Sequence, residues 1–348
     1  MKEILANRKK LLMVFILAGA VITGLIFGFF FLFTAPQQQA DEEVFVASFV
    51  LDKEGLISQL QDRGFIKSAW VFNLALQAKG VSEISPGGYR VSKSMNVWIL
   101  AKVFSVDPDL VWVTIPEGWR KEQIGERLAN ALDWGKDQLS DWIQKYTAMN
   151  FDSIEGVYFP DTYLIPKDED GLSVSGRFQD RFEEKFTSYY NEFFEQDIKW
   201  TTGLTLASII QREAAGGHDM GLIAGILWNR LFDGMRLEVD ATVQYVRDDV
   251  LHYGQARYNT QPLEPYSSEG GWWTPIKPED KSIASPYNTY RNEGLPPHPI
   301  CNPGIAAIEA VLNPQETDCF YYLHDSNRQI HCASTYQEHL DNIETYLR

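Results

Sequence analysis

A glutamate at the end of an apolar segment is the residue of this sequence best suited to acid–base chemistry. Residues 204–210 are so rich in Leu, Ile and Ala that they predict a helix buried over most of its circumference. Glu213 lies four residues after Ile209 and just before Gly216–Gly217, so it continues one side of that helix. Because burial penalises a carboxylate, we expect a raised pKa and a proton-donor role for Glu213. The alternative is a solvated, purely structural helix end.

Polar residues recur in the apolar segments that follow. Asn229, Asp240 and Thr242 each interrupt an apolar run, and a buried polar group needs a partner. They therefore either brace the backbone or face a substrate. Residues 285–290 read SPYNTY and combine turn residues with hydroxyl and amide groups that can bind sugar hydroxyl and N-acetyl groups.

Several blocks of the sequence together resemble the YceG-like (MltG) family of endolytic murein transglycosylases. They cover roughly residues 112–345 in the family's order, and each is weak alone but specific in combination. The blocks are EGVYFPDTY (155–163), LASIIQRE (206–213), NRL (229–231), LEVDATV (237–243), SPYNTY (285–290), GLPP (294–297), NPG (302–304) and the closing segment from His331 to His339. In the family the Glu that ends the LASIIQRE-like block is catalytic, and here that residue is Glu213.

The resemblance implies a reaction and a set of site residues. The family cleaves the bond between N-acetylmuramic acid and N-acetylglucosamine inside glycan strands without water, which leaves 1,6-anhydro ends. Glu213 is then the catalytic residue, and we expect neither a metal nor an organic cofactor. The expected substrate-binding residues are Asn229, Glu238, Asp240, Thr242, Tyr287, Asn288, Thr289 and Glu338. The expected partners are peptidoglycan strands and penicillin-binding protein synthases. A catalytically silent peptidoglycan-binding or scaffold protein is the alternative.

The sequence departs from the family pattern in two places. Glu238 replaces the usual Gln and Ala241 the usual Pro in the block at 237–243. Residues 247–283 are also longer than the usual link and contain Trp272 and Trp273. Such aromatic residues either stack on sugar rings as a lid or fix a long loop to the surface.

Composition limits the partners and the chemistry. The 348 residues carry a formal net charge of −16, which disfavours nucleic acid as a partner because phosphate binding needs clustered Lys and Arg. There are three cysteines without a Cys-x-x-Cys motif, so a cysteine-based zinc site is not expected. Cys319 and Cys332 lie in a predicted hairpin, and the sequence leaves a disulfide between them open.

The N-terminal segment has the pattern of a membrane anchor. Lys2, Arg8, Lys9 and Lys10 precede an uncharged run at residues 11–33 that is long enough to cross a bilayer. A cleaved signal peptide is the alternative, but its apolar region is usually shorter. We expect a single-pass anchor in the cytoplasmic (inner) membrane. The positive-inside rule places residues 1–10 in the cytoplasm and everything after the linker at 34–43 outside it.

The remaining pattern predicts an α+β fold in two parts. Residues 44–112 have the patterns of a strand, two helices and a second strand, in this order. This order resembles the small LysM-like lobe of the same family. Residues 113–348 form the expected YceG-like mixed α+β catalytic domain. Its predicted elements include helices at about 178–194, 204–213, 220–232 and 305–312, and a hairpin formed by 320–323 and 330–333.

Overall fold

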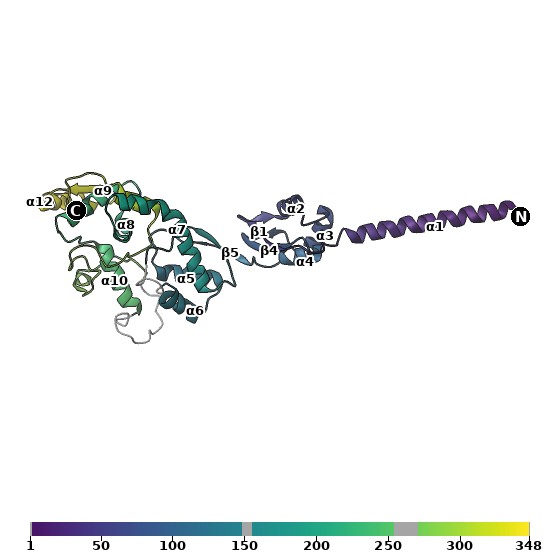
Figure 1. Cartoon of the computed structure of the whole chain (residues 1–348), viewed down its shortest axis with the longest axis horizontal. Coiled ribbons are helices and arrows are strands. Elements are labelled where there is room, and N and C mark those ends of the chain that lie inside the picture. Colours follow the sequence, from purple (N-terminus) through teal and green to yellow (C-terminus); the bar gives the residue numbers. More distant parts are fainter. Residues whose placement is uncertain (1, 148–154, 254–270, 348) are drawn as a thin grey trace. The chain divides into compact units, whose positions relative to one another are not determined.

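The chain folds into two compact units, which are described separately (Figure 1). The computed structural model describes residues 2–147, 155–253 and 271–347. The first unit comprises Met1–Val113 and Tyr163–Asp168, and the second comprises Thr114–Thr162 and Glu169–Arg348. Both contain helices and strands, so the expected α+β class is confirmed.

The first unit begins with the long helix α1 (Lys2–Phe31). Its segment Leu12–Phe31 has a mean hydropathy of 2.5 and none of it is buried. Apolar side chains that point outward all around a helix are unfavourable in water and favourable in lipid. By length and composition, this helix can cross a membrane.

A small α+β lobe follows in the same unit. Its elements are β1 (Glu42–Ala47), β2 (Leu51–Asp52), α2 (Lys53–Asp62), α3 (Ala69–Ala78), β3 (Glu83–Ile84), β4 (Gly87–Ser92) and α4 (Val97–Val103). Asp52 caps α2, since its side chain accepts a hydrogen bond from the Gly55 amide at 2.8 Å. The structure divides the strand signal near residues 44–51, because Ala47 pairs with Gly87 whereas Leu51 pairs with Ile84.

A four-stranded sheet orders this lobe. The strands lie in the order β1-β4-β5-β6, where β5 is Leu110–Thr114 and β6 is Thr162–Pro166. β4 pairs antiparallel with both β1 and β5. The core contains Phe45 and Tyr89 from the sheet and Leu56, Phe72 and Leu100 from the helices, all at most 1% exposed.

The second unit is mainly helical. Its elements are α5 (Lys121–Leu132), α6 (Lys136–Asp141), a π-helix (Trp142–Tyr146), α7 (Gly171–Glu195), α8 (Trp200–Glu213), α9 (Met220–Phe232), α10 (Asp240–Tyr253), a 3-10 helix (Pro278–Ser282), α11 (Ile305–Leu312), β7 (Tyr321–His324), β8 (Ile330–Ala333) and α12 (Tyr336–Tyr346). Helix α8 lies at the centre of this unit and contacts α7, α9, α10 and α11. Every residue from Gly203 to Ile210 is buried, as the density of apolar residues predicts.

A disulfide closes the C-terminal hairpin. β7 and β8 pair antiparallel with Tyr322 opposite Cys332, and Cys332 is bonded to Cys319. The third cysteine, Cys301, is a buried free thiol. The structure thus settles the pairing that the sequence leaves open.

Candidate active site

Glu213 is the last residue of α8. The helix ends there because Ala214 adopts an extended conformation (φ −67°, ψ 137°), although its amide still donates to the Ile210 carbonyl at 2.9 Å. The eight buried residues Gly203–Ile210 precede Glu213 by only a few positions, whereas Glu213 itself is partly exposed. Glu213 is therefore held on the rigid core and is partly exposed.

Two hydrogen bonds orient the Glu213 carboxyl group. The Tyr322 hydroxyl donates to Glu213 Oε2 at 2.7 Å, and the Ala241 amide also donates to this side chain. Burial raises the pKa of Glu213, and the negative charge of Asp240 raises it further, whereas the Tyr322 hydrogen bond lowers it. The net shift is upward, so the protonated form persists to higher pH than in an ordinary glutamate. This is what a general acid requires.

The segment at 237–242 carries two more carboxylates, and the charge of one of them, Asp240, acts on Glu213. Glu238 and Asp240 are both exposed, and the Tyr290 hydroxyl donates to Asp240 Oδ1 at 2.6 Å. Glu238 has φ of 51°, an uncommon left-handed conformation for a residue other than glycine. The structure thus brings Asp240 and Glu213 together, and the charges of Glu213, Asp240 and Glu238 all act on Tyr290.

The side chains of Thr242 and Thr289 hold the backbone of residues 237–242 in place. The Thr289 hydroxyl accepts from the Val239 amide at 3.0 Å and lies 2.9 Å from the Thr242 hydroxyl. Both threonine side chains are at most 1% exposed. Of the two roles that the sequence leaves open for Thr242, these contacts are those of a backbone brace.

The other predicted binding residues make structural contacts. The Asn229 amide donates to the carbonyls of Thr317 and Cys319 at 2.7 and 3.1 Å. The Asn288 side chain is buried and donates to the carbonyls of Lys281 and Ile283. The ring of Tyr287 packs near that of Tyr245, with 5.2 Å between the ring centroids. Glu338 accepts from the amides of Ser334 and Thr335, which makes it part of the capping box of α12.

Tyr322 and Arg230 are site residues that the sequence reasoning did not identify. Arg230 donates to the Phe320 carbonyl at 2.5 Å and to the Leu237 carbonyl at 2.7 Å. It therefore ties the strand that carries Tyr322 to the segment that carries Asp240. The strand pattern at 320–323 indicates alternating sides but not which tyrosine faces Glu213, so no sequence signal names Tyr322.

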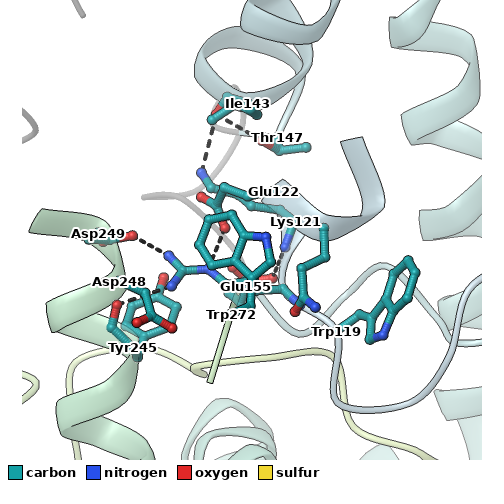
Figure 2. Close-up of polar contacts among 12 residues, drawn as sticks. Trp119, Lys121, Glu122, Ile143, Thr147, Glu155, Tyr245, Asp248, Asp249 and Trp272 are labelled. Atoms are coloured by element: carbon teal, nitrogen blue, oxygen red, sulfur yellow. Dashed lines mark hydrogen bonds and ion pairs between the residues drawn. The ribbon is translucent and has the colours of Figure 1, made fainter. Parts of the chain in front are cut away.

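A second polar cluster is buried at the start of α5 (Figure 2). Arg120 pairs with Glu122 and Asp249, and the Glu155 Oε1 atom accepts from the Lys121 amide at 2.8 Å. Burial raises the pKa of Glu155 to about 8, with a contribution from the charge of Glu122. The contacts named here join buried groups of the chain to one another, which is the arrangement expected of a cluster that braces the fold.

The two tryptophans at the end of the long aromatic segment are fixed to α5. Trp272 Nε1 donates to Glu126 Oε2 at 3.3 Å, and Trp273 Nε1 donates to Gln123 Oε1 at 2.8 Å. These contacts favour the anchoring interpretation over the lid for both indoles. The stretch 254–270 lies outside the described residues.

Within residues 2–147, 155–253 and 271–347, no group of three or more His, Cys, Asp or Glu side chains is arranged to hold a metal ion. His331 instead hydrogen-bonds Asp325 at 3.1 Å and stacks on Tyr346 with ring centroids 3.6 Å apart. His339 stacks on Tyr321. These are contacts of structural histidines.

Comparison with known proteins gives consistent results. A protein from Bacillus subtilis named "Endolytic murein transglycosylase" is 29% identical over 84% of this chain and 81% of its own length. A protein of the same name from Streptococcus pneumoniae is 25% identical over 83% of this chain, which matches 55% of that longer protein. A crystal structure of a yceG-like protein from Listeria monocytogenes shares the fold, with a TM-score of 0.55 and 24% identity over 87% of this chain and 99% of the other. Because the family model itself matches residues 52–345, this chain belongs to the YceG-like family.

Proposed function

We propose that this chain is an endolytic murein transglycosylase, which cuts glycan strands of peptidoglycan internally. The observation that carries the proposal is Glu213, a partly exposed residue whose carboxyl group has a raised pKa and is held by Tyr322 and the Ala241 amide at the end of a buried helix. The names of the Bacillus and Streptococcus relatives support the same activity.

In the proposed reaction Glu213 acts first as an acid and then as a base. It protonates the glycosidic oxygen between N-acetylmuramic acid and N-acetylglucosamine, and this bond breaks. The resulting carboxylate then takes the proton of the muramyl C6 hydroxyl, whose oxygen closes the 1,6-anhydro ring. Because the nucleophile belongs to the substrate, one catalytic carboxyl group is sufficient. A hydrolase would use a second carboxylate about 5–9.5 Å away.

The other predicted residues take two roles in this proposal. The exposed carboxylates Glu238 and Asp240 contact the sugar rings, and so does Tyr287, which is partly exposed although its ring packs near Tyr245. Asn229, Thr242, Asn288 and Thr289 hold the segments that carry these groups. Glu338 stabilises α12, and its contribution to substrate binding is indirect.

We also propose roles for the other segments of the chain. We propose that residues 44–112 form a LysM-like lobe that contacts glycan, and that residues 113–348 form the catalytic domain. α1 anchors the chain in the cytoplasmic membrane with residues 1–10 inside, following the basic residues before the apolar run. Penicillin-binding protein synthases are the proposed partners, since they produce the strands that this activity would cut.

The length distribution of glycan strands tests the endolytic activity. Full-length protein in detergent is incubated with long, uncrosslinked strands, and the products are separated by size. We expect the mean strand length to fall early, before disaccharides accumulate, and no change with Glu213→Gln. Binding of strands without any shortening by the wild-type protein would favour the silent glycan-binding alternative.

A further inference from the structure

Arg212, the residue before Glu213, carries a charge that the described part of the chain does not pair. No hydrogen bond or ion pair to its guanidinium group is present among these residues, and its Nε atom is buried without a partner. Burial lowers the pKa of Arg212. A desolvated cation without a partner costs free energy, so an anion from outside the chain would stabilise this position.

The buried arginines of the same unit are paired. Arg120 forms ion pairs with Glu122 and Asp249, and Arg247 forms one with Asp248 at 2.7 Å. Arg230 hydrogen-bonds three backbone carbonyls. The fold therefore satisfies these buried guanidinium groups, whereas Arg212, which is partly exposed with a buried Nε atom, has no such partner among the described residues.

The guanidinium group of Arg212 is held in a defined place. Its Cζ atom lies 4.2 Å from the centre of the Trp273 ring, and a cation in this position is attracted by the ring. Gly118 also lies next to this guanidinium group. A Cβ added to Gly118 would lie 3.2 Å from Arg212 Nη1, so the absence of a side chain there lets Arg212 approach the backbone closely.

Trp273 is itself fixed in an unusual conformation. Its φ of 61° lies in the left-handed region, which is strained for a bulky residue. Hydrogen bonds from its amide to Asp248 Oδ2 and from its indole to Gln123 Oε1, both 2.8 Å, hold it there. This strained arrangement positions the indole against one face of the guanidinium group.

The neighbouring carboxylates are already engaged. Asp248 accepts from Arg247 through Oδ1 and from the Trp273 amide through Oδ2. Glu213 accepts from Tyr322 and from the Ala241 amide. Both act on Arg212 through their charge, but neither hydrogen-bonds it.

We propose that Arg212 binds a carboxylate of the glycan substrate beside the bond that Glu213 cleaves. This inference rests on the proposed function and names the part of the substrate that is recognised. A guanidinium group binds carboxylates through two parallel hydrogen bonds. The ring hydroxyl and N-acetyl groups of the glycan are uncharged, so the anion is either a stem-peptide carboxylate or the lactyl carboxylate of a muramic residue without peptide. Because the chain has a net charge of −16, its overall field repels such a polymer, and a local cation is needed to hold it.

Binding measured without turnover tests the proposal. The full-length Glu213→Gln protein in detergent is titrated with uncrosslinked strands whose carboxylates are free or converted to methylamides. We expect methylamidation to weaken binding about 10- to 100-fold, the range of a charge-assisted bidentate contact. Adding Arg212→Gln should weaken binding to the free strands by the same factor and leave binding to the capped strands unchanged. Arg212→Lys should restore part of the preference.

The matched control is Arg177→Gln, which removes an exposed arginine whose partner is Glu169. It should keep the full preference for free carboxylates, and thermal unfolding should show that every variant is folded. Equal binding of free and capped strands by the Glu213→Gln protein would overturn the proposal, as would a preference that persists with Arg212→Gln. Strands stripped of peptide identify which carboxylate binds Arg212. If Arg212→Gln still weakens binding to these strands, the carboxylate is the lactyl group of muramic acid; if it no longer does, the carboxylate belongs to the stem peptide. Cleavage by wild-type protein is scored separately, so failure of the proposed activity is distinguished from failure of this contact.

Discussion

At the scale of single residues, the pKa of Glu213 depends on groups from two segments that are distant in the sequence. Tyr322 comes from β7, and the Ala241 amide and Asp240 come from the start of α10. Their effects on the pKa of Glu213 oppose each other, because a hydrogen bond to the carboxylate lowers the pKa whereas a nearby negative charge raises it. Removing either group should therefore change the pH at which Glu213 loses its proton, in opposite directions.

Two substitutions should move the pH profile in opposite directions. The acid function is lost as pH rises through the pKa of Glu213. Tyr322→Phe removes a hydrogen bond that lowers this pKa, so the alkaline limb of kcat/KM should move to higher pH, with about a tenfold loss of activity. Asp240→Asn removes a charge that raises the pKa, so the limb should move to lower pH.

Tyr321→Phe is the matched control for the first substitution. Tyr321 packs against Tyr336 and His339 and keeps its ring in this variant, so the pH profile should not move. Shifts of the same direction in Tyr322→Phe and Asp240→Asn would contradict the assigned contacts.

The sequence predicts those site residues that lie within one continuous motif, but not those that folding brings in from a distant segment. The apolar density before Glu213 indicates its place at the edge of the core, and the structure agrees. Tyr322 lies 109 positions away from Glu213, and strand alternation does not specify which strand face meets α8. The substrate-binding roles of Asn229, Glu238, Asp240, Thr242, Tyr287, Asn288, Thr289 and Glu338 remain predictions.

At the scale of elements, α8 must pack closely for Glu213 to hold its place. Gly203 in α8 faces Phe193 of α7, and a Cβ there would lie 2.1 Å from the ring. We expect Gly203→Ala to lower the free energy of unfolding by about 1–3 kcal/mol, the cost of overpacking a core. Urea unfolding measures this change.

Gly176→Ala in α7 is the control for this substitution. A Cβ at Gly176 meets nothing within 4 Å, so alanine should stabilise the helix by about 0.5–1 kcal/mol. A stabilising effect of Gly203→Ala would show that α7 and α8 are not packed this closely.

The disulfide should stabilise the hairpin that carries Tyr322. The Cys319–Cys332 bond closes a loop with a sequence separation of 13. Replacing both cysteines with serine should lower the free energy of unfolding by about 2–3 kcal/mol. A reducing agent should lower the Tm of the wild-type protein similarly and leave the double variant unchanged. An equal Tm with and without the agent in the wild-type protein would contradict this role.

Local signals predict most elements and miss those that depend on tertiary partners. Helices α9 and α11 begin and end at the predicted residues, because their apolar patterns are clear. The short helix α6 and the strand β6 have no such pattern, and the sequence does not predict them. β6 is part of a sheet whose other strands come from another part of the sequence.

At the scale of the whole molecule, α1 exposes its apolar side chains along the whole of Leu12–Phe31, for example Phe27 with 73% exposure. A segment with this exposure is stable in lipid. We therefore expect the full chain to stay with membranes after high-salt extraction, and a chain lacking residues 1–40 to be soluble. Release of the full chain by salt alone would contradict the anchor.

The mass of the newly formed strand ends tests the central claim most directly. Full-length protein in detergent, with Glu213→Gln as control, is incubated with long uncrosslinked strands, and the new internal ends are analysed by mass spectrometry. The proposed mechanism predicts muramic ends that are one water lighter than hydrolysis products, and none with Glu213→Gln. Ends that carry the added water would contradict the transglycosylase mechanism and require a second carboxylate beside Glu213.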